Sequence, residues 1–313
     1  MTFSRTLRTS IAILLTTYVV WSAEPARVAQ AAARADLSWV AAALLLVLGD
    51  RTLMAYRWIE LLCALTPGSR PRFGTVLQIF FVSTFVGTFL PSVGGDVYRA
   101  YRLAGHNVRG SESAASVLMD RLLGVLSIVL LAVVALLLMP RFARDWWISL
   151  SLIVAAAGCV LAAAVVFSSR AASLVQGGAS WVPGQRLSRV LHSITEGVRG
   201  YSRYRGVLAR VLAMSVVVQI IRVLQAYCLG RAIGIDLGLA AYFVFIPLIV
   251  LVMQLPISVS GLGTGQAAAD WLFGQAGVPS AEAVALSLLF IALGTIGNLP
   301  GAALYAMGDW RKG

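Results

Sequence analysis

Charged and amide side chains occur inside the apolar stretches of this sequence. Asp120 and Arg121 lie about two turns inside one apolar segment, and Arg222 lies inside another, with Gln219 and Gln225 three residues away on either side. A charge at membrane depth costs at least about 2.5–3.5 kcal/mol, so each of these residues is a candidate for ligand binding. Residues three apart share a helix face, which suits the Gln219, Arg222, Gln225 stripe to an interior cavity. The alternatives are an Asp120–Arg121 structural ion pair and interhelical hydrogen bonds from the stripe.

A break rich in proline and glycine, followed by charges, comes directly after one strongly apolar segment. It contains Pro91, Gly94-Gly95-Asp96 and then Arg99 and Arg102. Asp96 could cap the helix that follows. The same helix start, with glycines that allow close approach and Arg99 one turn on, would also suit a lipid phosphate.

A second break of similar type lies far downstream. It runs from Pro256 through Ser258 and Gly261 to Gln266. Two Gly/Pro-interrupted apolar segments in corresponding halves of a chain indicate a transporter-like binding site. The glycines resemble a nucleotide-binding loop only superficially, since no P-loop lysine or βαβ unit accompanies them.

Composition places the chain in the membrane. Of 313 residues, 59% are hydrophobic and 12% are charged, against about 25% charged in soluble domains. The net charge of +12 comes from arginines between apolar segments, which favours positive-inside anchoring and anionic lipid headgroups over nucleic acid. The three cysteines lack metal or redox spacing, and no nucleophile–base pair can be argued, so we expect no cofactor, no metal and no enzymatic activity.

Apolar length and loop charge together predict the topology. About 20 apolar residues are needed to cross a bilayer. If Phe73–Leu90 dips in and returns, Arg99, Arg102 and Arg109 all stay on the cytoplasmic side, as the positive-inside rule requires. The same reasoning applies to Leu239–Pro256, which dips from the outer face. We therefore predict an all-α polytopic membrane protein in one transmembrane domain, residues 1–313, with cytoplasmic termini and two opposed re-entrant hairpins that suggest an inverted repeat. The six predicted full spans are Leu7–Ser22, Leu37–Leu62, Ala114–Met139, Trp146–Phe167, Val207–Leu229 and Glu282–Ala306.

Three further segments carry local predictions. Residues 185–204 place apolar side chains on one helix face and arginines on the other, which predicts an amphipathic helix at the cytoplasmic surface; a solvated linker helix is the alternative. Asp50 and Arg51 interrupt the second span, and Arg57-Trp58 near its end is expected to anchor the helix at the interface. Gly297-Asn298-Leu299-Pro300-Gly301 contains G-x-x-x-G, which predicts close helix packing.

In these motifs the chain resembles the transmembrane-region family of lysylphosphatidylglycerol synthase/flippase proteins. Each motif is loose alone, but the ordered set covers the chain from about Leu37 to Ala306. The resemblance implies a bacterial or archaeal plasma-membrane protein that moves, or helps modify, a lipid or lipid-linked headgroup. The matching motifs are Arg57-Trp58, Leu90-Pro91, Gly94-Gly95-Asp96, Arg99-Ala100-Tyr101-Arg102, Asp120-Arg121-Leu122-Leu123-Gly124, Pro256-Ile257-Ser258, Gly261-Leu262-Gly263 and Leu299-Pro300-Gly301.

The sequence departs from the family pattern at two places. Relatives often have asparagine shortly before the first Leu-Pro, where this chain has Thr88, and Arg-Glu where it has Gly265-Gln266. A substrate charge recognised there in relatives is therefore not carried over. The resemblance does not include the soluble aminoacyl-transferring domain of the bifunctional relatives, so we expect no lipid lysylation from this chain alone.

These observations predict a lipid translocase for anionic headgroups. The partners would be a membrane phospholipid or lipid-linked substrate, with a lipid-biosynthesis enzyme and a homo-oligomer as further candidates. The alternative is an accessory subunit or enzyme of polyprenyl-linked glycan or hopanoid-type lipid synthesis, and a small-solute transporter is a third. Arg99, Arg102, Arg121 and Arg222 are predicted to bind the anion, and Asp96, Asp120 and Gln266 to orient the arginines or contact a cationic substituent. The full predicted site is Asp96, Arg99, Arg102, Asp120, Arg121, Gln219, Arg222, Ser258, Gly261 and Gln266.

Overall fold

A computed structural model describes residues 35–65, 72–88, 94–104, 109–138, 146–168, 185–253 and 263–307, with single positions 140, 144, 170 and 173. Secondary structure within these ranges is helical, which confirms the predicted all-α class. The predicted first span and the tips of both breaks, including Pro91, Ser258 and Gly261, lie outside the described residues. The helices are α3 (Leu37–Leu65), α4 (Phe73–Gly87), α5 (Gly94–Ala104), α6 (Gly110–Leu138), α8 (Trp146–Phe167), α10 (Gln185–Gly200), the 3₁₀ turn η1 (Tyr201–Arg203), α11 (Arg205–Ala232), α12 (Leu239–Met253), α13 (Thr264–Gly274) and α14 (Ser280–Met307).

Several helices are built to face lipid. In the described part of the chain, α3, α6, α11 and α14 are long and apolar enough to cross a membrane. Large apolar side chains such as Leu137 on α6 and Leu161 on α8 lie exposed on the outside of the bundle. A soluble protein does not present apolar surface of this extent to water, whereas lipid tails solvate it without cost. The chain is therefore a multi-pass membrane protein.

The first predicted break forms a hairpin of two short helices. α4 has 15 residues and α5 has 11, and at about 1.5 Å rise per residue neither can cross a hydrocarbon core about 30 Å thick. The two helices pack together. A Cβ atom on Gly95 would lie 2.7 Å from the Ser83 carbonyl oxygen and 3.0 Å from Gly87 Cα. Only glycine permits this backbone approach, so the glycine pair fixes the hairpin.

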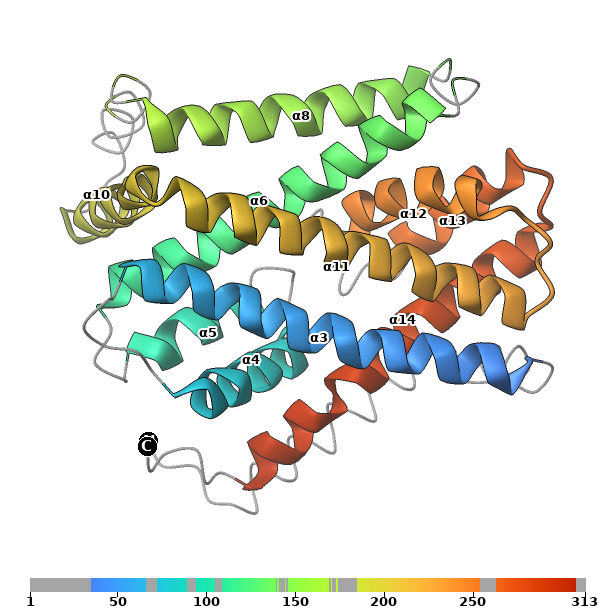
Figure 1. Ribbon diagram of the computed structural model, residues 1–313, viewed down its shortest axis with the longest axis horizontal. Helices are drawn as coiled ribbons and strands as arrows, with labels where there is room; N and C mark the ends of the chain where they lie inside the picture. The colour runs from blue at the N-terminus through green and yellow to red at the C-terminus, as the bar shows by residue number, and fades with distance from the viewer. Residues whose placement is uncertain are drawn as a thin grey trace.

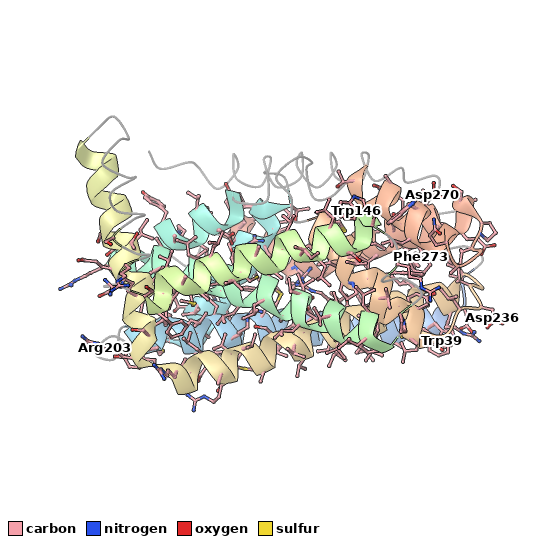
Figure 2. All side chains as sticks on the ribbon, turned by 90° about the horizontal axis from the view of Figure 1, so that it is seen from above. Trp39, Trp146, Arg203, Asp236, Asp270 and Phe273 are labelled. Atoms are coloured by element: carbon pink, nitrogen blue, oxygen red, sulfur yellow. The ribbon has the colours of Figure 1, made fainter. Side chains whose placement is uncertain are left out.

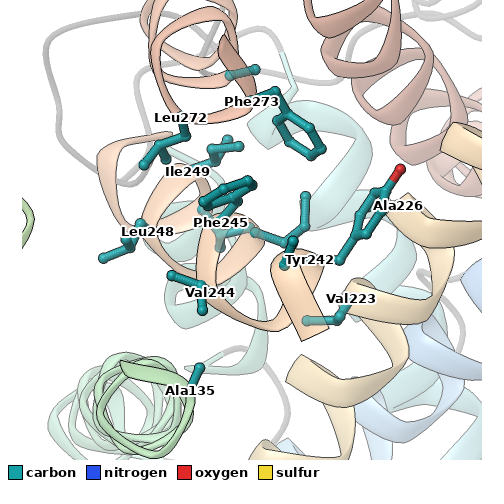
Figure 3. Packing of buried hydrophobic residues seen from close by; sticks show 14 of the residues in the cluster. Ala135, Val223, Ala226, Tyr242, Val244, Phe245, Leu248, Ile249, Leu272 and Phe273 are labelled. Carbon is teal, nitrogen blue, oxygen red and sulfur yellow. The ribbon is translucent and has the colours of Figure 1, made fainter. Parts of the chain in front are cut away.

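The second break forms a hairpin of the same dimensions. α12 again has 15 residues and α13 has 11. Their apolar faces meet through Tyr242, Phe245 and Phe273, whose rings stack edge to face at centroid distances of 5.2–5.3 Å (Figure 3). Val223 of α11 and Ala135 of α6 border this core, so the hairpin is anchored against both long helices.

The helices form two inverted halves. In Figure 1, α3 and α11 run side by side in opposite directions, α4 and α5 occupy one end of the bundle, and α12 and α13 occupy the other. The series α3, α4, α5, α6 has lengths of 29, 15, 11 and 29 residues, and the series α11, α12, α13, α14 has 28, 15, 11 and 28. Each hairpin also packs on the last helix of the other half, α4 on α14 and α12 on α6. These matched series confirm the predicted opposed hairpins and show the inverted repeat.

The predicted amphipathic segment is helical as α10 followed by η1. It lies across the α4–α5 end of the bundle (Figure 1). Tyr201 is fully buried, and its hydroxyl donates to the carbonyl of Leu61 at 2.9 Å. Gly197 lies against Ala115 and the Ser111 carbonyl of α6. The segment is therefore docked on the bundle, while its membrane-surface role stays a prediction.

The fold predicts that Arg109 and Asp236 lie on opposite sides of the membrane. Arg109 immediately precedes α6, whose Ser111 lies against Gly197 of α10. Asp236 lies at the opposite end of the bundle from Arg203, which closely follows α10 (Figure 2). In a variant lacking Cys63, Cys159 and Cys228, we expect a membrane-impermeant maleimide to label Asp236→Cys in intact cells and Arg109→Cys only after lysis. Both positions are exposed, so access to the reagent depends on the membrane alone. Labelling of both from one side would contradict the fold, and labelling of Arg109→Cys alone would invert the orientation.

Candidate functional site

A cavity of about 360 Å³ with charged side chains in its wall lies between the first hairpin and the long helices. Its wall includes charged side chains from α3, α5, α6 and α11, together with Asn298 from α14. A volume in this range suits a small ligand or a headgroup, since ligand pockets span about 300–1,000 Å³. The charged residues on the wall are Asp50, Arg51, Arg57, Asp96, Arg99, Asp120, Arg121 and Arg222.

One ion network connects α3, α5 and α6. Asp120 accepts from Arg57 Nε at 2.8 Å and from Arg99 at 3.3 Å. Arg99 also reaches Asp96 at 3.2 Å, and Asp96 accepts from Arg121 at 2.6 Å. Each carboxylate thus lies between two guanidiniums, and the five residues alternate in charge. We call this set the α6 network.

The packing around the α6 network shows which members are structural. Arg57 also donates to the Ser215 hydroxyl at 2.9 Å, and Arg99 lies 4.7 Å from the centre of the Trp58 ring. Arg57, Arg99 and Asp120 are almost fully buried, while the Arg121 side chain is 42% exposed. The cavity therefore meets a fixed ion cluster whose accessible cation is Arg121.

A second ion network lies between α3 and α11. Asp50 pairs with Arg51 at 2.7 Å and with Arg222 at 3.4 Å. Arg51 also donates to the carbonyl of Gly294 on α14 at 3.3 Å. Both arginine side chains keep some exposure, 14% for Arg51 and 19% for Arg222, while Asp50 is buried. We call this set the Asp50 network.

Several cavity-lining donors are left unused. Within the described residues, Arg51 Nε, Arg99 Nε and Gln225 Nε2 are buried and have no hydrogen-bond partner. A buried donor without a partner costs about 1–3 kcal/mol. Two cavity-lining acceptors of the described residues, Asp50 Oδ1 and Asn298 Oδ1, are likewise buried without a hydrogen-bond partner, so a ligand here would meet both unused donors and unused acceptors.

Matching positions of the two halves line the cavity. Arg51 and Gln219 are both the fifteenth residue of their helices, Met54 and Arg222 the eighteenth, and Arg57 and Gln225 the twenty-first. Equivalent positions of α3 and α11 therefore both contribute to the cavity wall.

The halves differ in charge at these matched positions. Asp120 and Arg121 of α6 correspond to Phe290 and Ile291 of α14. Arg99 of α5 corresponds to Ala269 of α13. The first half supplies most of the charge, and the second half supplies apolar wall.

Six of the ten predicted site residues meet at this cavity. They are Asp96, Arg99, Asp120, Arg121, Gln219 and Arg222. Arg102 is not part of the lining, and the side-chain oxygen of Gln266 accepts from the Gly263 backbone at the start of α13. Ser258 and Gly261 lie outside the described residues.

Three interpretations from the sequence need correction. Asp120 does not pair with its neighbour Arg121, because adjacent residues on a helix point about 100° apart. Asp96 is the third residue of α5 instead of its cap, because the helix begins at Gly94. Arg57-Trp58 is not an interface anchor, since both residues are buried and Trp58 donates to Ser116 at 3.2 Å.

The site includes residues that the sequence prediction left out of its ligand set. Asp50, Arg51 and Arg57 share the cavity with the predicted residues. The sequence could have identified them as site residues, since all three are charged residues in an apolar segment. Asn298 donates to the Thr88 hydroxyl at 3.0 Å and thereby joins α14 to the end of α4.

The arrangement suits binding of an anion. Guanidinium groups form strong charge-assisted hydrogen bonds with phosphate and carboxylate oxygens. The cavity is lined by the short helices α4, α5 and α12 as well as by the long helices α3, α6, α11 and α14. Its buried guanidiniums are screened less by water and salt than exposed ones. In the described part of the chain, no group of three or more histidine, cysteine or acidic residues is placed to hold a metal ion.

Comparison with protein families gives one finding that bears on the whole chain. The family model described as the lysylphosphatidylglycerol synthase TM region matches residues 6–301. Comparison with curated proteins gives no match. The matched range includes every residue of the α6 network and of the Asp50 network.

Proposed function

The chain belongs to the lysylphosphatidylglycerol synthase TM region family, and from this premise we propose that it translocates the anionic headgroup of a lipid or lipid-linked molecule across the plasma membrane. The observation that carries the proposal is the charged cavity between the first hairpin and four helices long and apolar enough to cross a membrane. A headgroup in the cavity would exchange its water shell for guanidinium contacts, while the acyl chains stay in the bilayer.

The accessible arginines would contact the headgroup. Arg121 and Arg222 are the most exposed cations that the two networks present to the cavity. Asp96 and Asp50 hold them in place at 2.6 and 3.4 Å. The carboxylates would therefore orient the arginines, and the arginines would bind the anion.

We also propose that the chain is not itself an enzyme. The polar side chains of the cavity are mostly arginines and aspartates engaged with one another. A carboxylate that accepts from two guanidiniums has its oxygen atoms already occupied by those donors, which leaves little room for contact with a substrate. Binding and passage, rather than bond cleavage, suit such a wall.

Reconstitution into sealed liposomes tests the proposal. Both leaflets of the liposomes would contain a lipid that carries a fluorophore on an acyl chain. A headgroup-specific reagent added outside would then measure the fraction of labelled lipid in the outer leaflet over time. We expect the wild type to equilibrate an anionic phospholipid, and Arg222→Gln to slow it at least about tenfold, because loss of a charged contact costs about 1.5–3 kcal/mol. Arg222→Gln should fold normally, because Asp50 keeps Arg51 as its partner.

The matched control is Arg210→Gln on the same helix. Arg210 is 68% exposed and pairs with Glu60 outside the cavity. We expect it to transport at the wild-type rate. Wild-type rates in both Arg222→Gln and Arg121→Gln would refute the proposed site, and no movement of any lipid by the wild type would refute the proposed function.

A further inference from the structure

Two glycines in the middle of long helices lie on the cavity wall. Gly124 is the fifteenth residue of α6 and Gly294 is the fifteenth residue of α14, so the two glycines occupy matching positions of the inverted halves. Both are partly exposed. Glycine inside a helix costs about 1 kcal/mol relative to alanine, so some other requirement must favour glycine at these two positions.

Close helix packing is the requirement at other glycines of the bundle. A Cβ atom on Gly95 or Gly301 would come too close to the backbone of α4, and a Cβ atom on Gly297 would overlap the Val47 side chain. Any side chain at these positions would push two helices apart. Glycine is therefore explained there by the packing alone.

Packing does not explain Gly124 and Gly294. Beyond its own helix turn, a Cβ atom on Gly124 would meet, among the described residues, only the Arg57 guanidinium, at 3.9–4.0 Å. A Cβ atom on Gly294 would likewise meet only the Arg51 guanidinium, at 3.7 Å, in the part of the chain that the structure describes. These are ordinary van der Waals distances. The described protein therefore has room for alanine at both positions, and what glycine leaves open is space in the cavity beside an arginine.

The two open spaces lie in different parts of the cavity. Arg51 and Arg57 are six residues apart on α3, which corresponds to about 9 Å along the helix axis. Each guanidinium is held by its own contacts, Arg51 by the carbonyl of Gly294 at 3.3 Å and Arg57 by Asp120 at 2.8 Å. A ligand that fills both spaces is therefore longer than a single phosphate group.

We propose that Gly124 and Gly294 determine which headgroups the cavity accepts, by leaving room for a polar substituent beyond the phosphate. This inference rests on the proposed function, since it assigns the specificity of the same site. The substituent would lie against the bare backbone of α6 and α14, beside the guanidiniums of Arg57 and Arg51. A phosphodiester that carries only a methyl group would not need this space.

Three phosphodiester lipids of equal charge test the inference in neutral detergent. Dioctanoyl phosphatidylmethanol, phosphatidylglycerol and phosphatidylinositol each carry one negative charge and differ in the size of the substituent on the phosphate. By calorimetric titration, we expect the wild type to bind at least one of the two larger lipids at least as tightly as phosphatidylmethanol. Tighter binding of phosphatidylmethanol than of both larger lipids would overturn the inference.

Gly124→Ala and Gly294→Ala each add one methyl group to the cavity wall. One methylene more or less in a pocket changes discrimination by about 10–200-fold. We therefore expect each variant to weaken binding of the larger lipid by about tenfold or more relative to binding of phosphatidylmethanol.

The melting temperature separates specificity from packing. Alanine favours the helix over glycine and, among the described residues, overlaps no atom at either position. Both variants should therefore melt at or above the wild-type temperature while they discriminate against the larger lipid. A lower melting temperature in both variants would show that the two glycines serve packing and would overturn the inference.

Gly49→Ala on α3 is the matched control, since Gly49 is exposed and does not belong to the cavity lining. It should keep the wild-type ratio of the two affinities. An unchanged ratio in both Gly124→Ala and Gly294→Ala would overturn this inference while leaving lipid translocation intact. If no lipid binds and no labelled lipid moves in liposomes, the proposed function itself fails.

Discussion

Asp120→Ala is expected to destabilise the protein by about 3–5 kcal/mol, because removing one partner of a buried ion pair strands the other. Asp120 accepts from Arg57 at 2.8 Å and from Arg99 at 3.3 Å, and all three are buried. Arg99 would retain Asp96, but Arg57 would keep, among the described residues, only the Ser215 hydroxyl. We expect a fall in melting temperature on the order of 10 °C, measured by fluorescence-detected size exclusion after heating.

Two double variants identify the arginine that pairs with Asp120. Arg57→Ala combined with Asp120→Ala should recover part of the lost stability, since no unpaired charge is left behind. Arg121→Ala combined with Asp120→Ala should not recover it, because Arg121 pairs with Asp96. Recovery with Arg121 instead of Arg57 would contradict the α6 network.

Gly301→Ala is expected to disrupt the contact between the first hairpin and the last long helix. A Cβ atom at Gly301 would overlap the Phe81 carbonyl and lie 2.8 Å from Phe85 Cβ. Backbone cannot move aside as a side chain can, so we expect at least about 1–3 kcal/mol of destabilisation. Lower membrane accumulation and a lower melting temperature are the measurements.

Gly49→Ala on α3 is the matched control. In the part of the chain that the structure describes, a Cβ built at Gly49 meets no atom within 4 Å beyond its own helix turn, and alanine favours helix over glycine by about 1 kcal/mol. This variant should be at least as stable as the wild type. Equal stability of the two alanine variants would show that α4 does not approach α14 as closely as described.

The two hairpins could be predicted because their cause is local. Proline, glycine and charge after a short apolar run are visible without knowledge of the fold, and α4 and α12 begin at the predicted residues. The G-x-x-x-G segment was likewise predictable, since Gly297 and Gly301 lie against Val47 and Phe81. The match between the two halves could not be seen in the sequence, because the halves agree in helix length and not in residue identity.

The ion partners could not be predicted because they are far apart in sequence. Arg57 pairs with a carboxylate 63 residues away. Its proximity to Trp58 suggested an interfacial position, but α3 continues to Leu65, about two turns further, so both residues lie within the bundle. The Gln219, Arg222, Gln225 stripe was predictable, because a shared helix face depends on spacing alone.

The separation between Arg57 and Asp120 also has a consequence for biosynthesis. The ribosome adds about 5–20 residues per second, so Arg57 emerges roughly 3–13 s before its carboxylate. During that interval α3 carries Arg57 without its buried partner, and release into lipid would cost about 2.5–3.5 kcal/mol for this charge alone. Because Asp120 removes this cost once α6 is made, we expect α3 to be held more firmly in the bilayer after α6 arrives than before.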